Sequence, residues 1–166
     1  MMSIYKRILV LGCPGSGKSF FSARLHEITG IPLIHLDNVW WRENKTHISR
    51  EEFDLQLESL LKLDQWILDG DYSRTYEIRI SACDTIILLD YSEAVCMDGI
   101  SKRIGKHRAD IPWVESDLDP ELVAMVRNYR SENRPRLLAL IDKYPGRQVF
   151  VFHERSEADD WLNALN

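Results

Sequence analysis

The chain has 166 residues, of which 45% are hydrophobic and 28% are charged, and its net charge is −5. This composition is typical of a globular protein, and the length suits one domain covering residues 1–166. Negative net charge disfavours sequence-independent binding to duplex DNA, although a local basic patch would still permit direct DNA binding. No apolar run reaches the ~20 residues of a membrane span, so we expect no membrane partner. The cysteines lack metal-ligand spacing and indicate free thiols and a cytoplasmic location; they are Cys13, Cys83 and Cys96.

The first elements along the chain are a strand, a glycine-rich loop and a helix. An apolar run predicts a buried strand at Ile8–Leu11, and apolar residues at helical spacing predict a helix at Lys18–Thr29. Between them, the run Gly12-Cys13-Pro14-Gly15-Ser16-Gly17-Lys18-Ser19 matches the phosphate-binding loop pattern G-x-x-x-x-G-K-S/T at every fixed position. Strand, loop and helix are the context that this motif requires, so a chance Gly/Ser turn is a weak alternative.

This motif predicts a site for ATP and Mg²⁺. Glycine permits positive φ, so the N–H groups of the loop can turn toward a phosphate, and the following helix adds its positive end. The Lys18 ammonium would reach the β- and γ-phosphates, and the Ser19 hydroxyl would bind Mg²⁺. The residues expected to bind the cofactor are Gly12, Pro14, Gly15, Ser16, Gly17, Lys18 and Ser19.

The second strand, predicted at Pro32–Leu36, is followed by a carboxylate. Asp37 comes where ligands bind in an open parallel sheet, beyond the carboxyl ends of the strands; it could orient a substrate hydroxyl or cap a helix. Trp40 could stack on a flat substrate or belong to the core. A helix is predicted next at Arg50–Leu63, because a capping box begins at Ser49.

The third strand, predicted at Trp66–Leu68, is followed by Asp69, which would hold Mg²⁺ through water. Arg74 lies early in the next predicted helix, Ser73–Ala82, and its planar guanidinium could bind an acceptor anion. The alternatives are a turn carboxylate for Asp69 and a solvent-exposed helix residue for Arg74.

The remaining elements continue the alternation of strands and helices. Their predicted bounds are a strand at Thr85–Leu89, helices at Glu93–Gly105, Pro120–Lys143 and Ser156–Leu165, and a strand at Gln148–Phe152. Asp90 after the fourth strand is a weaker candidate for the metal site, because many buried strands end in Asp. The alternation predicts an α/β fold of three layers, with a five-stranded parallel sheet and helices on both faces.

The C-terminal half is rich in arginine around an irregular stretch of the chain. Residues 105–120 contain glycine, two prolines and clustered charge, and we expect them to form a short, mobile lid. Phosphoryl transfer spreads negative charge over the transferred group, which cationic side chains stabilise. The first candidates for this role are Arg103 and Arg134, and behind them come Arg108, Arg130 and Arg136. A solvent-exposed basic helix face is the alternative for each.

Several of these segments together resemble adenylate kinase and its relatives among nucleotide and small-molecule kinases. The segment Leu68–Thr75 is similar to the adenylate kinase segment L-D-G-F-P-R-T with one residue inserted. In that family the arginine of this segment binds the acceptor phosphate, and the aspartate helps to hold the water shell of the metal. The resemblance therefore implies these roles for Arg74 and Asp69.

The chain resembles the DNA topology modulation (FlaR-like) proteins more closely; these look like adenylate kinases with a short lid. The matching segments cover nearly the whole chain: Gly12–Ser19, His35–Asp37 with Trp40, Trp66–Tyr72 and Asn133–Arg136. Asp71 departs from the expected pattern Asp-Gly-Asn-Tyr, and its negative charge disfavours an anionic acceptor. The resemblance implies a P-loop NTPase fold like that of the nucleoside monophosphate kinases.

The sequence therefore predicts an ATP-dependent phosphotransferase that acts on a nucleotide or another small molecule. The candidate residues are Lys18, Arg103, Arg134 and Asp37 for catalysis, Asp37, Trp40, Asp69 and Arg74 for the acceptor, and Ser19 with Asp69 (through water) for the metal. The alternative is a nucleotide-dependent regulatory protein that affects DNA topology or another macromolecule. A plain ATPase or GTPase switch fits less well, because no guanine-reading N-K-x-D motif is present. The oligomeric state is left open between monomer and homodimer.

Overall fold

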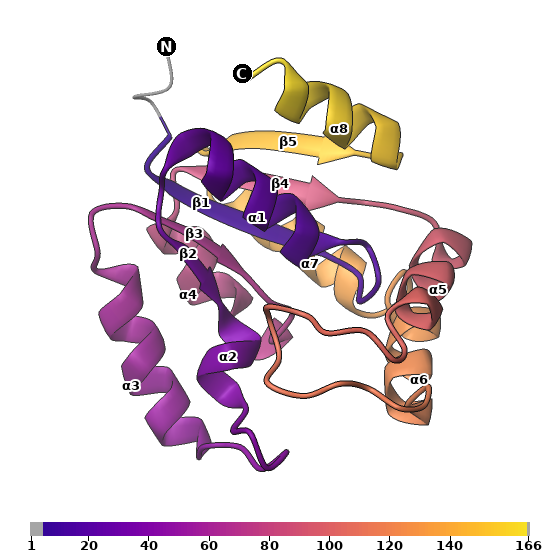
Figure 1. Ribbon diagram of the computed structural model, residues 1–166. Coiled ribbons are helices and arrows are strands. Elements are labelled where there is room, and N and C mark those ends of the chain that lie inside the picture. Colours follow the sequence, from indigo (N-terminus) through magenta and orange to yellow (C-terminus); the bar gives the residue numbers. More distant parts are fainter. Residues whose placement is uncertain (1–4, 166) are drawn as a thin grey trace.

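A computed structural model describes residues 5–165 and places five parallel strands at the centre of the protein (Figure 1). The strands are β1 (Arg7–Gly12), β2 (Leu33–His35), β3 (Trp66–Asp69), β4 (Thr85–Leu89) and β5 (Gln148–Phe152). Their order across the sheet is β2-β3-β1-β4-β5, and every neighbouring pair is parallel. The chain therefore adds strands on both sides of β1, and the carboxyl end of β1 lies where ligands bind in such sheets.

Helices cover both faces of this sheet (Figure 1). They are α1 (Lys18–Thr29), α2 (Leu36–Trp40), α3 (Arg50–Leu61), the 3₁₀ turn η1 (Ser73–Thr75), α4 (Tyr76–Ala82), α5 (Glu93–Lys102), α6 (Pro120–Asn128), α7 (Asn133–Lys143) and α8 (Arg155–Asn163). Side chains of α1, α5 and α8 pack on one face, and those of α3, α4 and α7 pack on the other. None of the helices within residues 5–165 is both long enough and apolar enough to span a membrane.

The central strand β1 shows why the sheet is buried on both sides. Ile8 and Val10 point into the core beneath α1 and α8, whereas Leu9 and Leu11 point into the core beneath α3 and α4. All four are at most 1% exposed. Burial of each such side chain contributes roughly 1.5–3 kcal/mol. A continuous apolar run is the pattern expected for a strand covered on both faces, and the strand predicted from it is confirmed.

The predicted helix at Pro120–Lys143 is wrong, because the structure divides it. Helix α6 ends at Asn128, and α7 begins at Asn133. Proline has no N–H to donate to the carbonyl one turn earlier, so Pro135 could not lie in the middle of one long helix. The break places Pro135 in the first turn of α7, where no such hydrogen bond is made.

The chain after β2 also differs from the prediction. The strand stops at His35, and the short helix α2 starts at Leu36, whose side chain is fully buried. Asp37 and Trp40 therefore lie on a helix at the carboxyl end of the sheet. Half of the predicted capping box of α3 is formed, since the Ser49 hydroxyl accepts a 3.1 Å hydrogen bond from the N–H of Glu52, whereas the Glu52 side chain accepts from Gln56.

Residues 103–119, which connect α5 to α6, form no helix or strand. This connecting segment runs from α5 toward α2 along the carboxyl end of the sheet and returns to α6 (Figure 1). The N–H of Gly105 donates to the carbonyl of Glu115 at 2.7 Å, and this hydrogen bond joins the outgoing and returning parts of the segment. The segment contains the predicted lid, residues 105–120, except for Pro120, which is the first residue of α6.

Candidate active site

The glycine-rich loop between β1 and α1 depends on its glycines. Gly15 and Gly17 have φ of 83° and 90°, in the left-handed region that favours glycine. Space is also restricted, because a Cβ on Gly12 would lie 2.7 Å from the carbonyl oxygen of Leu89, and one on Gly15 would overlap the carbonyl of Cys96. The loop is therefore packed tightly between β4 and α5, in a conformation that other residues would strain.

The amino end of α1 fits a phosphate group. Its N-cap is Gly17, no side chain of the described residues caps it, and its first turn contains no acidic residue. The N–H groups of this turn and the helix dipole therefore favour an anion. Lys18 lies within the loop, where Nζ donates to the carbonyls of Gly12 (2.8 Å) and Cys13 (3.1 Å). The buried hydroxyl of Ser16 has no partner among residues 5–165.

Arg155, at the start of α8, braces the outer side of the same loop. Its Nη1 donates to the carbonyl of Ser16 at 3.0 Å, and its Nη2 donates to that of Gly15 at 3.1 Å. The guanidinium also lies over the ring of Tyr91, 5.4 Å from its centroid. Arg155 occupies loop carbonyls and does not compete with a ligand for the N–H groups of the loop, of which that of Ser16 donates to the carbonyl of Cys13. The sequence offered no signal for this contact, which joins residues 139 positions apart.

Strands β2 and β3 end side by side in a histidine and an aspartate. The register pairs His35 with Asp69, and Nδ1 of His35 lies 2.9 Å from both carboxylate oxygens. Burial acting alone would lower the pKa of His35, but the hydrogen bond and charge of Asp69 outweigh it and raise that pKa. Asp69 is buried at the carboxyl end of the sheet, and the histidine fixes the orientation of its carboxylate.

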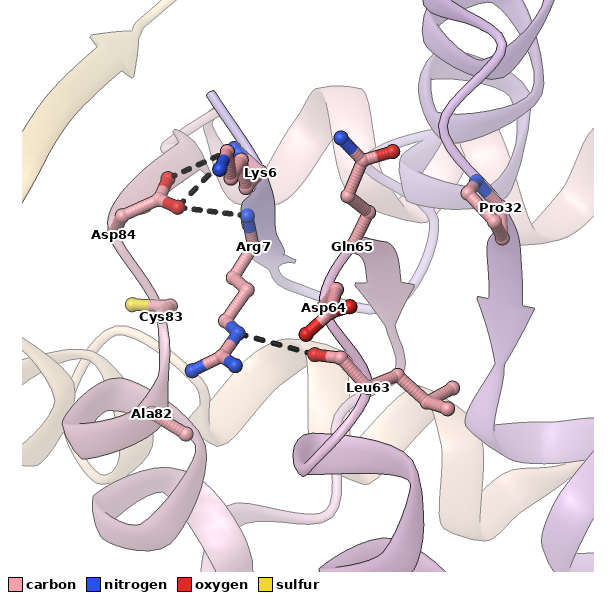
Figure 2. Close-up of a pocket in the computed structure, with 9 residues that line it drawn as sticks. All are labelled: Lys6, Arg7, Pro32, Leu63, Asp64, Gln65, Ala82, Cys83 and Asp84. Carbon is pink, nitrogen blue, oxygen red and sulfur yellow. Dashed lines mark hydrogen bonds between the residues drawn. The ribbon is translucent and has the colours of Figure 1, made fainter. Parts of the chain in front are cut away.

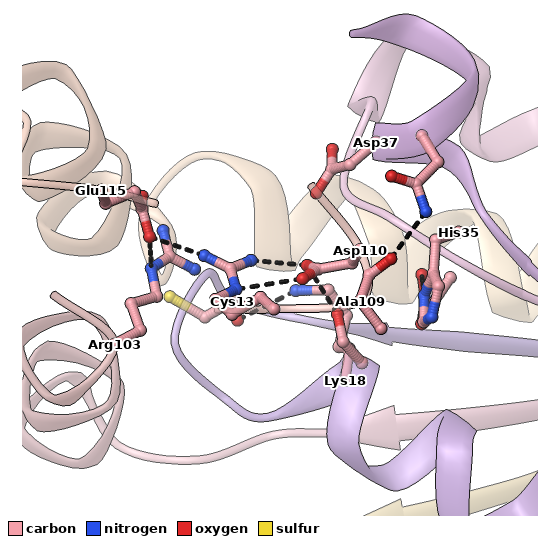
Figure 3. A network of polar contacts seen from close by, with 12 residues as sticks. Cys13, Lys18, His35, Asp37, Arg103, Ala109, Asp110 and Glu115 are labelled. Atoms are coloured by element: carbon pink, nitrogen blue, oxygen red, sulfur yellow. Dashed lines mark hydrogen bonds and ion pairs between the residues drawn. The ribbon is translucent and has the colours of Figure 1, made fainter. Parts of the chain in front are cut away.

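Asp37 faces the same region from α2. Burial raises its pKa, and the charges of Asp110 and Asp69 act in the same direction. A 2.7 Å hydrogen bond from the hydroxyl of Tyr72 and the charge of Lys18 oppose this effect without cancelling it. Figure 3 shows Asp37, Asp110 and Lys18 close together. Carboxylates from three separate segments therefore lie near the phosphate-binding loop.

Trp40 belongs to an aromatic group beside Asp37. Its ring stacks on that of His47, with centroids 4.3 Å apart, and meets Phe53 and Tyr72 edge-on. The side chain is half-buried, so it packs in this group and keeps part of its surface exposed.

Two arginines after β3 have different surroundings. Arg74 donates two hydrogen bonds, of 3.0 and 2.8 Å, to Asp54, and both side chains are largely exposed. Arg79 is fully buried, and burial lowers its pKa to about 10. It donates to the hydroxyl of Thr75 and to the carbonyls of Gly70, Asp71 and Tyr72. Arg79, which no sequence motif marks, therefore holds the loop that follows Asp69.

The connecting segment brings a carboxylate to the phosphate-binding loop. Asp110 is 2% exposed, and its Oδ2 accepts a 2.8 Å hydrogen bond from the hydroxyl of Ser19. Arg108 donates to both oxygens of Asp110 and to Glu115, which it meets at 2.7 Å. Figure 3 shows this network between α5 and the sheet. Asp110 was missed because an aspartate in an irregular stretch carries no pattern that predicts its partner.

The two arginines predicted to be catalytic lie in different places. Nε of Arg103 is 3.1 Å from Glu115, so Arg103 belongs to the same polar network as Asp110. Burial lowers the pKa of Arg103, and the neighbouring charge of Arg108 lowers it further. Arg134 instead pairs with Asp90 at the end of β4.

A hollow of about 950 Å³ lies at the opposite end of the sheet, near the amino ends of the strands. Figure 2 shows its lining, in which Asp84 accepts hydrogen bonds from the N–H groups of Lys6 and Arg7. Because ligands of parallel sheets bind at the carboxyl ends of the strands, we place the candidate active site at the glycine-rich loop and not in this hollow.

The sequence matches no family model and no curated protein sequence. Solved structures with a similar fold include two shikimate kinases and a sugar kinase. The shikimate kinase from Acinetobacter baumannii, in complex with shikimate, has a TM-score of 0.66 at 12% identity, with 97% of this chain and 90% of that chain covered. The shikimate kinase from Bacteroides thetaiotaomicron has a TM-score of 0.63 at 12% identity, with 96% of each chain covered. The sugar kinase from Janibacter sp. has a TM-score of 0.54 at 18% identity, with 96% and 91% covered.

At these identities the comparison establishes the fold. The chain has the P-loop NTPase-like fold of shikimate kinase, with a five-stranded parallel sheet and helices on both faces. The fold class predicted from the sequence is thereby confirmed.

Proposed function

We propose that this protein transfers a phosphoryl group from ATP to a small-molecule or nucleotide acceptor, with Mg²⁺ as the metal. The observation that carries this proposal is the uncapped amino end of α1 beside Lys18, with the carboxylates of Asp37 and Asp69 at the same end of the sheet. Solved structures with this fold include kinases of small molecules, as their names state.

The nucleotide side of the site uses the loop Gly12–Ser19. The N–H groups of the loop bind the β- and γ-phosphates, and Lys18 leaves its carbonyl partners to neutralise them. Ser19 binds Mg²⁺, and Asp69 holds it through water. When bound, Mg²⁺ neutralises charge that develops on the phosphates. Residues 5–165 contain no group of three or more His, Cys, Asp or Glu that could hold a metal by themselves. This suits Mg²⁺, which takes few protein ligands and completes its shell with phosphate and water.

The acceptor side is built around Asp37. Its raised pKa suits a group that accepts a proton from an acceptor hydroxyl, because efficient proton transfer needs a pKa closer to the working pH. Trp40 contributes a flat surface, and Arg74 would have to leave its exposed pair with Asp54 to reach an anionic acceptor. Catalysis then rests on positioning and on electrostatic stabilisation.

Residues 105–120 act as the lid in this proposal. The lid excludes water, which limits wasteful hydrolysis of ATP. Arg103 in the network beneath the lid and Arg134 at α7 would have to turn from Glu115 and Asp90 to supply positive charge to the transferred group. Four further expectations remain predictions. They are the resemblance to DNA topology modulation proteins, a single domain, a cytoplasmic location, and a monomeric or homodimeric state.

The test is ADP formation from Mg-ATP in the presence of nucleoside monophosphates, nucleosides, sugars and other small alcohols. We expect one acceptor class to stimulate turnover, and Lys18→Ala to abolish that stimulation. The control is Lys62→Ala, which removes the same charge from an exposed position at the end of α3. ATP binding without turnover for any acceptor, together with salt-sensitive DNA binding, would instead support the nucleotide-dependent regulatory protein.

A further inference from the structure

The contact between Asp110 and Ser19 joins the connecting segment to the residue that would bind the metal. The two oxygens lie 2.8 Å apart, although the residues are 91 positions apart in the chain. The carboxylate is buried, so it does not merely touch the loop from solvent. Any ligand that reaches the Ser19 hydroxyl must therefore meet Asp110 as well.

The segment that carries Asp110 is fixed on both sides. The side chain of Asn38 on α2 donates to the carbonyl of Ala109 at 2.8 Å. Further along, the ring of Trp113 packs edge-on against Trp41, with centroids 5.2 Å apart. These contacts hold Asp110 against the loop independently of its bond to Ser19. The position of Asp110 is therefore set by the packing of the connecting segment against α2 and Trp41.

We propose that Asp110 is a ligand of the Mg²⁺ that accompanies the nucleotide, supplied by the lid to the metal that Ser19 holds. This inference rests on the proposed function and adds a residue to its metal site. Oxygen ligands of Mg²⁺ lie at about 2.0–2.1 Å in an octahedron, so neighbouring ligand oxygens are about 2.9 Å apart. The Ser19 and Asp110 oxygens already have this spacing. A carboxylate and a hydroxyl are also the hard oxygen ligands that this metal prefers.

The charges around Asp110 predict how this residue changes the affinity for nucleotide with and without Mg²⁺. Arg108 donates hydrogen bonds to both oxygens of Asp110 but is shared with Glu115, so it balances only part of the negative charge of Asp110. A triphosphate without metal would be repelled by this carboxylate, whereas a metal placed between them attracts both. Asp110 therefore makes nucleotide binding depend on Mg²⁺. An aspartate that merely blocks the loop would weaken nucleotide binding with and without metal.

The first test measures the affinity for ADP by calorimetry, in Mg²⁺ and in EDTA. For the unmodified protein we expect Mg²⁺ to tighten binding on the order of tenfold or more, and for Asp110→Asn we expect this gain to fall at least about fivefold. The control is Asp117→Asn, an equal change at an exposed position of the same segment. An unchanged gain from Mg²⁺, or equally tighter binding in both conditions, would overturn the proposal. Absence of ADP binding to the unmodified protein would overturn the proposed function itself.

A second test needs no substitution and covers the case in which Asp110→Asn does not fold. Fe²⁺ replaces Mg²⁺ in the ADP complex, and ascorbate with hydrogen peroxide then generates hydroxyl radicals that cut the backbone near the metal. We expect cuts within residues 108–112 as well as at 18–20, read by mass spectrometry. Cuts at 18–20 without cuts at 108–112 would place Asp110 away from the metal and refute the proposal.

Discussion

The guanidinium of Arg134 holds the carboxylate of Asp90 in two hydrogen bonds of 2.8 Å each, which join α7 to the carboxyl end of β4. The Asp90 side chain is only 2% exposed. The hydrogen bond from Arg134 lowers the pKa of Asp90, and the charge of Arg134 lowers it further against the effect of burial. Arg134 and Asp90, which no sequence pattern links, therefore form one ion pair.

Substitution of Arg134 by alanine is expected to destabilise the protein. It leaves the buried carboxylate of Asp90 without its main partner, at a cost of roughly 1.5–3 kcal/mol. In a chain of this size, this corresponds to a fall in Tm of roughly 4–10 °C, measured by calorimetry. Arg136→Ala on the same helix is the control, since Arg136 is exposed and its loss should change stability by less than about 0.5 kcal/mol.

The contribution of this pair should also depend on pH. Because the pKa of Asp90 is lower in the folded than in the unfolded protein, the pair stabilises fully above the ordinary carboxylate pKa of about 4. This stability is lost as the pH falls through the lower folded value. The difference in stability between the unmodified protein and Arg134→Ala should therefore shrink below about pH 4. A difference that stays constant down to acid unfolding would contradict this assignment.

The sequence was sufficient for the parts of this fold that local pattern determines. The strands Thr85–Leu89 and Gln148–Phe152 and the helix Lys18–Thr29 were predicted with the bounds that the structure shows. Each is specified by its own apolar spacing, and two of them also have glycines beside them, Gly17 and Gly30 at the helix and Gly146 before the last strand. The glycine-rich loop was recognisable for the same reason, since its chemistry lies in consecutive residues.

The contacts of the candidate site could not be predicted in this way, because they join distant segments. Nothing near Asp110 indicates that it meets Ser19, and nothing near Arg155 indicates that it braces the loop. The packing that turns the chain into α2 after His35 is equally non-local, since it depends on the burial of Leu36 beneath α3. Which side chains pair at the carboxyl end of the sheet therefore depends on tertiary structure and not on local sequence.

The second prediction concerns the two arginines after β3. Arg79→Ala removes the donors to the carbonyls of Gly70 and Asp71 and should cost roughly 2–6 kcal/mol, because each group left unsatisfied away from water costs about 1–3 kcal/mol. Urea unfolding measures this loss. Arg74→Ala is the matched control, since its exposed pair with Asp54 is worth less than about 1 kcal/mol.

Arg74→Ala, which should change stability little, is the substitution expected to change the kinetics. If Arg74 binds an anionic acceptor, Arg74→Ala raises the KM for the acceptor and leaves stability nearly unchanged. Equal losses of stability for Arg74→Ala and Arg79→Ala would show that the burial of Arg79 is not what holds the loop.

The third prediction concerns thiol reactivity. The hydrogen bond with Cys96 and burial both raise the pKa of Cys13, and burial raises the pKa of Cys83 to about 12. Because the thiolate is the reactive form, both should react with iodoacetamide at pH 8 on the order of tenfold or more slowly than a cysteine in an unfolded peptide. Mass spectrometry of the labelled peptides measures the rates. Unfolding in urea should restore rapid labelling, and rapid labelling of the native protein at Cys13 would contradict the packing of the loop.

The fourth prediction concerns Asp37 and its partner Tyr72. Asp37→Asn keeps a hydrogen-bonding side chain but removes the group that accepts the proton, so kcat should fall by about 10²–10⁴-fold while the affinity for nucleotide stays nearly the same. Tyr72→Phe removes the hydrogen bond that lowers the pKa of Asp37, so the pKa rises further. A base with a higher pKa loses its proton only at higher pH. The acid limb of kcat/KM should therefore move to higher pH in Tyr72→Phe, as a pH–rate profile would measure. An acid limb that stays in place, with kcat reduced, would assign Tyr72 to packing and remove Asp37 from the role of base.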